Sequence, residues 1–159
     1  MEYFFSSHEI AEMAMRVEEA GVEFYQKAAG FAADEKIKKI FLFLSNAEID
    51  HRNIFRGIME AEEKNDSLDE YSIDIASNIE YLIGKFEKAV FDLKSAEVSS
   101  LTVAKCLDVG IHVESGLIAA YSELHEVLIG KFYNVLEKII SEEKTHLEML
   151  QNVKKQLGL

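Results

Sequence analysis

Apolar and polar positions alternate along most of this chain with the period of an α-helix. Apolar or small residues recur every three or four positions from about Ser7 to Ala29, and again from about Glu35 to Glu62. Between these segments, Gly30 suits the position just after a helix and Asp34 is a candidate N-cap. The pattern therefore predicts a hairpin of two long helices.

A second hairpin is predicted near the C-terminus. The periodicity is interrupted over residues 63–72, and a short helix is predicted at about 78–93. A third long helix then runs from about Ser100 to Val127, and a fourth runs from near Gly130 to about Gln156. The connection between the second and third long helices, about 36 residues, is long enough to follow the whole bundle. We therefore expect an all-α four-helix bundle of two antiparallel hairpins joined by a long crossover that contains a short helix.

Composition supports one helical domain over residues 1–159. The chain has no proline and 8 glycines, so little interrupts its helices, and no apolar run reaches the roughly 18 residues of a membrane span. The first five residues do not resemble a secretory signal, so we expect a cytoplasmic protein. A net charge of −12 argues against a nucleic-acid partner. Cys106, the one cysteine, leaves no intrachain disulfide or cysteine-based metal site.

One motif appears twice in the chain: a lone glutamate followed about 30 positions later by Glu-x-x-His. The first copy is Glu18, Glu48 and His51, and the second copy is Glu114, Glu143 and His146. Each lone glutamate is also followed seven residues later by a tyrosine, Tyr25 or Tyr121. In a helical chain, one glutamate plus one Glu-x-x-His is half of a carboxylate site for two metal ions.

The spacing places these side chains at one point. The midpoint between the two glutamates of each copy falls at the predicted turn, so both lie about 21 Å from it along antiparallel helices. Four buried carboxylates would each cost several kcal/mol without cations, and two divalent ions would offset their charge. Oxygen-rich ligands with one imidazole per metal suit iron or manganese, with zinc a possible substitute. Tyr25 and Tyr121 are candidate donors to the ligand carboxylates, with core aromatics as the alternative.

Neighbouring residues of the same types are not assigned to the site. Glu18 is preferred to Glu19 because only Glu18 shares a helix face with Tyr25, and Glu143 is preferred to Glu142 because it keeps the Glu-x-x-His spacing.

The remaining histidines and several apolar residues are expected to be structural. His8, His112 and His125 are predicted to take no part in the site. Cys106 is expected to be a buried apolar residue, and Gly21 to allow close helix packing. Core packing is predicted for three phenylalanines, Phe41, Phe43 and Phe55.

These motifs resemble those of the rubrerythrin branch of the ferritin-like superfamily. The segments that carry the resemblance are Val17-Glu18-Glu19-Ala20-Gly21-Val22-Glu23-Phe24-Tyr25, Glu48-Ile49-Asp50-His51, His112-Val113-Glu114 and Glu143-Lys144-Thr145-His146. The resemblance implies a ferritin-like four-helix bundle with a di-iron centre, in which the six motif residues are ligands and Glu48 and Glu143 bridge the two irons.

Two departures from the rubrerythrin pattern are visible. The chain lacks a rubredoxin-like segment with two cysteine pairs, and it lacks the extra glutamate of the third helix, since Ile111 and Leu117 flank Glu114 at that spacing. The symmetric ligand set is closer to that of bacterioferritin-type centres.

The resemblance and the motifs lead to one functional hypothesis and two alternatives. The leading hypothesis is a homodimeric di-iron oxidoreductase that reduces peroxide or dioxygen, with electrons from a separate donor because the chain shows no fingerprint for a reducing cofactor. The first alternative is iron handling, as a ferroxidase, storage protein or metal sensor. The second alternative is a metal-free structural bundle.

Overall fold

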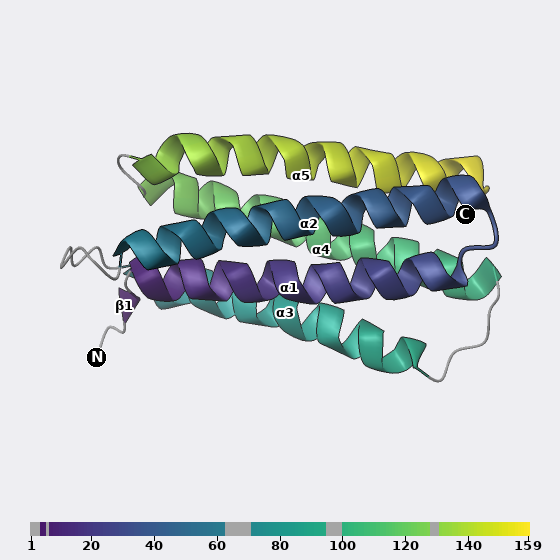
Figure 1. Cartoon of the computed structure of the whole chain (residues 1–159), viewed down its shortest axis with the longest axis horizontal. Coiled ribbons are helices and arrows are strands. Elements are labelled where there is room, and N and C mark those ends of the chain that lie inside the picture. The colour runs from purple at the N-terminus through teal and green to yellow at the C-terminus, as the bar shows by residue number, and fades with distance from the viewer. Residues whose placement is uncertain (1–3, 6, 63–70, 95–99, 128–130) are drawn as a thin grey trace.

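The computed structural model describes residues 4–5, 7–62, 71–94, 100–127 and 131–159. Their main feature is a bundle of four long helices with one shorter helix packed on it (Figure 1). The long helices are α1 (Ser7–Phe31), α2 (Glu35–Glu62), α4 (Ser100–Val127) and α5 (Lys131–Gln156), and the shorter helix is α3 (Ile73–Leu93). Among the described residues, no helix is long and apolar enough to cross a membrane. The predicted all-α bundle is confirmed.

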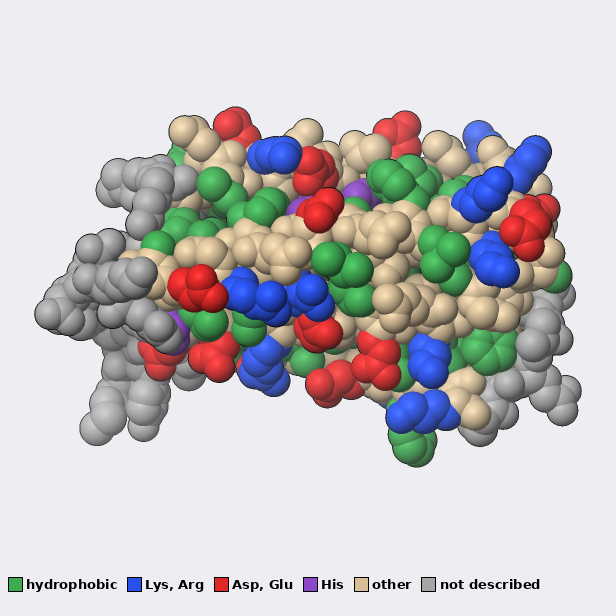
Figure 2. Space-filling view, viewed as in Figure 1, with side chains coloured by type: hydrophobic (Ala, Val, Ile, Leu, Met, Phe, Trp, Pro, Cys, Tyr) green, Lys and Arg blue, Asp and Glu red, His purple; other side chains and the backbone are tan. Residues whose placement is uncertain are grey.

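The two hairpins turn at opposite ends of the bundle. The turn between α1 and α2 lies at one end, whereas α4 meets α5 at the other end (Figure 1). Helix α3 runs the length of the bundle and packs against α1 and α4, as the predicted crossover requires. On the other side, α2 and α5 lie along each other. Figure 2 shows acidic, basic and apolar side chains mixed over these helices, with small areas of histidine between them.

The prediction for the first turn is confirmed at the start of α2 but is wrong at the end of α1. Asp34 caps α2, because its Oδ1 accepts hydrogen bonds from the backbone N–H groups of Lys36 (2.7 Å) and Ile37 (3.3 Å). Helix α1, however, continues through Gly30 to Phe31. Gly30 is therefore not a left-handed cap.

The crossover helix begins earlier than predicted. Helix α3 starts at Ile73 rather than near residue 78, and it ends at Leu93 as expected. Two short strands, β1 (Phe4–Phe5) and β2 (Tyr71–Ser72), pair antiparallel before α1 and α3. Strands of two residues are too short to show an alternating pattern, so the sequence did not indicate them. The remaining predicted residues of this connection lie outside the described ones.

The core forms where the helices face one another, and one predicted member is absent from it. Phe41 and Phe55 are buried as predicted, but 51% of Phe43 is exposed. Phe43 is one residue before the buried Leu44, which places it about 100° away around α2. Its ring instead lies at the surface between α2 and α5, next to His146.

Candidate metal centre

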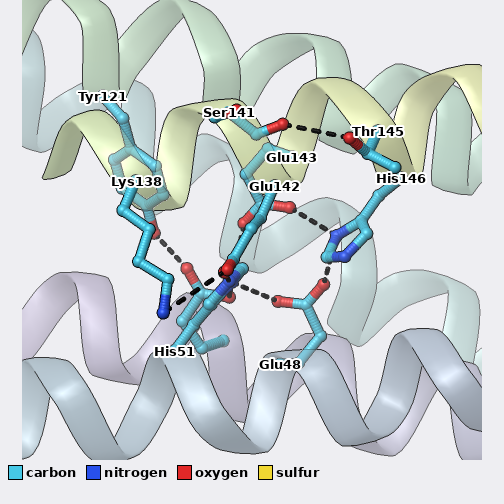
Figure 3. Close-up of polar contacts among 10 residues, drawn as sticks. Glu48, His51, Tyr121, Lys138, Ser141, Glu142, Glu143, Thr145 and His146 are labelled. Atoms are coloured by element: carbon cyan, nitrogen blue, oxygen red, sulfur yellow. Dashed lines mark hydrogen bonds and ion pairs between the residues drawn. The ribbon is translucent and has the colours of Figure 1, made fainter. Parts of the chain in front are cut away.

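Six acidic and imidazole side chains are buried together where the four long helices face one another, and Figure 3 shows four of them, Glu48, His51, Glu143 and His146. The six are Glu18 from α1, Glu48 and His51 from α2, Glu114 from α4, and Glu143 and His146 from α5. Each is at most 3% exposed, although glutamate is rarely buried without a partner. The structure thus brings together all six residues of the duplicated motif.

These residues form two overlapping groups. Within each group, one ligand atom per residue lies within 4.8 Å of every other. The first group is Glu18, Glu48, His51 and Glu143, and the second group is Glu48, Glu114, Glu143 and His146. Glu48 and Glu143 belong to both groups. This arrangement fits two neighbouring cations with one private glutamate each, one histidine each and two shared glutamates.

Unpaired polar atoms support this fit. Five carboxylate oxygens of the cluster and the Nδ1 atom of His51 are buried without a hydrogen-bond partner. His51 Nδ1 does lie 3.0 Å from Glu143 Oε1, but the two atoms are not aligned as a hydrogen bond. Each buried and unpaired polar atom costs about 1–3 kcal/mol. Divalent cations would satisfy these atoms, so the residues present fit a two-metal centre.

The ionisation of the cluster follows from burial and crowding. Burial, together with the negative charges of Glu143 and Glu18, raises the pKa of Glu48 well above its usual value. Burial and neighbouring Glu143 also raise the pKa of Glu114. Burial alone would lower the pKa of His51, but the adjacent Glu143 and Glu18 outweigh it and raise the pKa to about 11. Without metal, protons therefore balance part of the negative charge.

Two buried tyrosines donate hydrogen bonds to the glutamates that are not shared. Tyr25 on α1 donates to Glu114 Oε1 on α4, and Tyr121 on α4 donates to Glu18 Oε1 on α1. Burial first, and nearby carboxylates second, raise the pKa of both phenols, so both keep their protons. Both predicted candidates therefore contact carboxylates of the cluster, and each of the two bonds joins one hairpin to the other.

The residues behind the two histidines differ, and sequence reasoning missed this. His51 Nε2 lies 2.8 Å from Glu142 Oε2, and Lys138 Nζ lies 3.6 Å from the other oxygen of Glu142 (Figure 3). Behind His146 stands Phe43, whose ring is nearly perpendicular to the imidazole with centroids 6.1 Å apart. Glu142 belongs to neither ligand group, and the sequence did not indicate its contact with His51.

The other histidines lie outside both groups, as expected. His8 Nδ1 is 3.2 Å from the carbonyl oxygen of Met59, and His112 Nε2 is 3.3 Å from the hydroxyl of Tyr81. His125 stacks on a tyrosine of α5. These contacts attach helices to one another, away from the cluster.

Small and apolar residues next to the cluster set how closely the helices approach. A Cβ atom on Gly21 would lie 3.2 Å from Glu48 Cγ and 3.3 Å from Phe86, so this glycine does allow close packing. Leu117, at one position where the sequence lacks a further glutamate, is fully buried. Cys106 is also buried, and burial raises the pKa of its thiol to about 11. None of these side chains adds a ligand.

Comparison with known proteins agrees with the geometry. A crystal structure described as that of a ferritin-like diiron-carboxylate protein from Thermotoga maritima superposes with a TM-score of 0.75, at 26% sequence identity and over 98% of each chain. No curated protein matches the chain. The family model for rubrerythrin matches residues 9–154. The chain therefore belongs to the rubrerythrin family, with a ferritin-like diiron-carboxylate fold.

Proposed function

We propose that this chain is a di-iron oxidoreductase that reduces peroxide or dioxygen with electrons from a separate donor. The observation that carries the proposal is the pair of buried ligand groups that share Glu48 and Glu143. A purely structural role for the cluster is disfavoured because six of its polar atoms have no hydrogen-bond partner.

The ligand set divides naturally between two ions. Glu18 and His51 would hold one iron, Glu114 and His146 would hold the other, and the shared glutamates would contact both. Carboxylates with one imidazole per metal suit iron, and manganese or zinc can occupy such a set. When bound, two irons supply the one-electron steps that no side chain of this site can supply.

The protein's own contribution is to orient ligands, exclude water and hold protons. Tyr25 and Tyr121 fix the carboxylates of Glu114 and Glu18 through buried hydrogen bonds. Burial and the neighbouring carboxylates raise the pKa of Glu48, so its carboxyl holds a proton more readily than an exposed glutamate when metal is absent. The lone Cys106 is buried, so it is a poor candidate for an internal reductant, and an external electron donor is needed.

Peroxide turnover tests the proposal. Protein purified without added metal should contain iron by elemental analysis, and the iron-loaded protein should consume peroxide when a chemical reductant is supplied. Glu48→Ala should abolish this activity because its carboxylate faces both ligand groups. Glu148→Ala, which removes an exposed carboxylate from the same helix as Glu143, should leave it unchanged.

The alternative outcome is equally specific. Oxidation of ferrous iron without peroxide turnover would favour the iron-handling role over the proposed one. The proposal also includes a cytoplasmic homodimer, and light scattering separates a dimer from the hollow shell that iron storage requires.

A further inference from the structure

The two ligand groups have the same inner residues but different residues behind their histidines. Superposing the two copies of Glu-x-x-His pairs Ala47 with Glu142 and Phe43 with Lys138. In the structure, Glu142 of α5 contacts His51 and is itself paired with Lys138, whereas the ring of Phe43 from α2 packs on His146. The difference lies at matched positions of the two hairpins.

We infer that Glu142 positions His51 and thereby makes the two metal sites unequal, so that the site of Glu18 and His51 binds a divalent cation more tightly than the site of Glu114 and His146. This inference rests on the proposed metal binding and adds an order of occupation to it.

The contact geometry supports a positioning role for Glu142. Its Oε2 lies 2.8 Å from His51 Nε2, while the Nδ1 of the same ring faces the buried carboxylates. A carboxylate that accepts the outer N–H of an imidazole fixes the ring and strengthens the inner nitrogen as a metal ligand. His51 is 1% exposed, so water does not compete for that ring.

Lys138 does not cancel this effect. Its Nζ lies 3.6 Å from Glu142 Oε1, so it contacts the oxygen that His51 does not use. The lysine side chain is 69% exposed, and an ion pair of this kind contributes little because solvent screens it. Lys138 can therefore help to orient Glu142 without displacing it from His51.

The second site lacks an equivalent partner. Among the described residues, none makes a hydrogen bond or ion pair with the Nε2 atom of His146, whose contacts with carboxylates all involve Nδ1, and Ala47 occupies the position that matches Glu142. The nearby ring of Phe43 packs on His146 but cannot accept a strong hydrogen bond. The imidazole of this site is held by packing and by its own contact with Glu143, at 2.8 Å.

Titration with Co²⁺ against a competing chelator tests the inference on the whole protein. The wild-type chain should bind two ions in separate steps, with affinities that differ by roughly 10–100-fold, the usual effect of an outer partner of a metal-bound histidine. Glu18→Ala should remove the tighter step, and Glu114→Ala should remove the weaker one.

Variants at the outer positions identify the cause. Glu142→Ala should weaken only the tighter step, by roughly 10–100-fold, and Glu142→Gln should restore part of it because an amide oxygen still accepts the N–H. Ala47→Glu should tighten the weaker step by supplying the missing partner. Glu148→Ala, a matched loss of one carboxylate from α5, should change neither step.

A spectroscopic measurement separates positioning from general stability. In the Co²⁺-loaded protein, the exchangeable ring proton of His51 should give a slowly exchanging, paramagnetically shifted signal that disappears in Glu142→Ala. Two steps no further apart than expected for equivalent sites, or equal weakening of both by Glu142→Ala, would overturn the inference while leaving metal binding intact. Absence of any metal binding would instead overturn the proposed function.

Discussion

The hairpin of α1 and α2 and the hairpin of α4 and α5 share their inner chemistry and differ in what surrounds it. Both contribute one private glutamate, one shared glutamate and one histidine, and each receives a tyrosine hydroxyl from the other. Their outer residues have diverged, since Glu142 on α5 corresponds to Ala47 on α2. Buried ligands constrain one another because their combined charge must be balanced by bound cations or protons, whereas positions nearer the surface are screened by solvent.

Replacing a shared ligand should have a larger effect than replacing a private one. We expect Glu48→Ala to lose both metal ions and Glu18→Ala to lose one, because only Glu48 belongs to both ligand groups. Glu114→Ala is the matched control for Glu18→Ala in the other hairpin. Metal content after dialysis, measured by elemental analysis, gives the result. Two ions retained in Glu48→Ala would show that the groups do not share a ligand.

Removing the metal should make stability depend on pH between 7 and 9. His51 has a folded-state pKa of about 11, above its unfolded value of 6.5, so folding retains a proton over this range. That contribution is complete below the unfolded pKa and is lost as pH rises toward the folded value. One retained proton is worth about 1.4 kcal/mol per pH unit, so His51 alone should cost the metal-free protein about 3 kcal/mol of stability from pH 7 to 9.

Other groups of the cluster do not reverse this trend. The raised pKa values of Glu48 and Glu114, caused mainly by burial, act in the same direction. The pKa of Glu18 is lowered by hydrogen bonds that outweigh burial, and burial lowers the pKa of His146, so neither group titrates above pH 7 in either state. Urea unfolding at pH 7, 8 and 9 measures the slope. Metal-loaded protein is the control and should not lose stability in this way. A rise in the unfolding free energy of metal-free protein from pH 7 to 9 would contradict the raised pKa assigned to His51.

The inner site could be predicted from the sequence because it is duplicated and symmetric about two turns. Chance spacing rarely gives the same glutamate, Glu-x-x-His and tyrosine twice, and antiparallel helices bring residues equidistant from a turn together. Glu18 could be distinguished from Glu19, and Glu143 from Glu142, for the same reason. The long periodic helices and the crossover were predictable on the same physical basis, since their apolar faces repeat every three or four residues.

The outer residues could not be predicted because they depend on how helices from different hairpins are rotated. Whether Glu142 reaches His51 is decided by a contact between α2 and α5, which no spacing within one helix specifies. Phe43 was misassigned because composition favours burial of phenylalanine, while its angle around α2 places it at the surface. The ends of α1 and α3 were imprecise because propensity defines helix ends weakly.

The two tyrosines test whether the two hairpins are equivalent at the cluster, with a smaller expected change in stability. In metal-free protein, hydrogen bonds that outweigh burial lower the pKa of Glu18, whereas burial and Glu143 raise the pKa of Glu114, so Glu18 is the more readily ionised of the two acceptors. A hydrogen bond to a charged acceptor contributes more than one to a neutral acceptor. Tyr121→Phe should therefore cost about 2 kcal/mol and Tyr25→Phe about 1 kcal/mol.

Metal binding should remove that difference, because both glutamates are then ionised ligands. Urea unfolding of each variant, with and without metal, gives the four values needed. Equal costs in the metal-free protein would mean that the two glutamates share one protonation state, and the hairpins would then be more alike than the pKa shifts indicate.

The smallest expected effect comes from one methyl group. Gly110 on α4 corresponds to Ala14 on α1, and a Cβ at residue 110 would lie 3.0 Å from Leu150 Cδ1 and 3.2 Å from the hydroxyl oxygen of Tyr25. Gly110→Ala should gain up to about 1 kcal/mol from helix propensity but lose about 1–3 kcal/mol to overpacking. We expect a net loss of about 1 kcal/mol in urea unfolding.

Gly57→Ala on α2 is the matched control, since a Cβ there meets no atom within 4 Å and should stabilise the protein by about 1 kcal/mol. Combining Gly110→Ala with Tyr25→Phe should cost less than the sum of the single changes, because removing the hydroxyl relieves one of the two close contacts. If Gly110→Ala is as stabilising as Gly57→Ala, the space between α1 and α4 can accept a methyl group. Glycine at residue 110 would then not be required for the hydrogen bond between Tyr25 and Glu114.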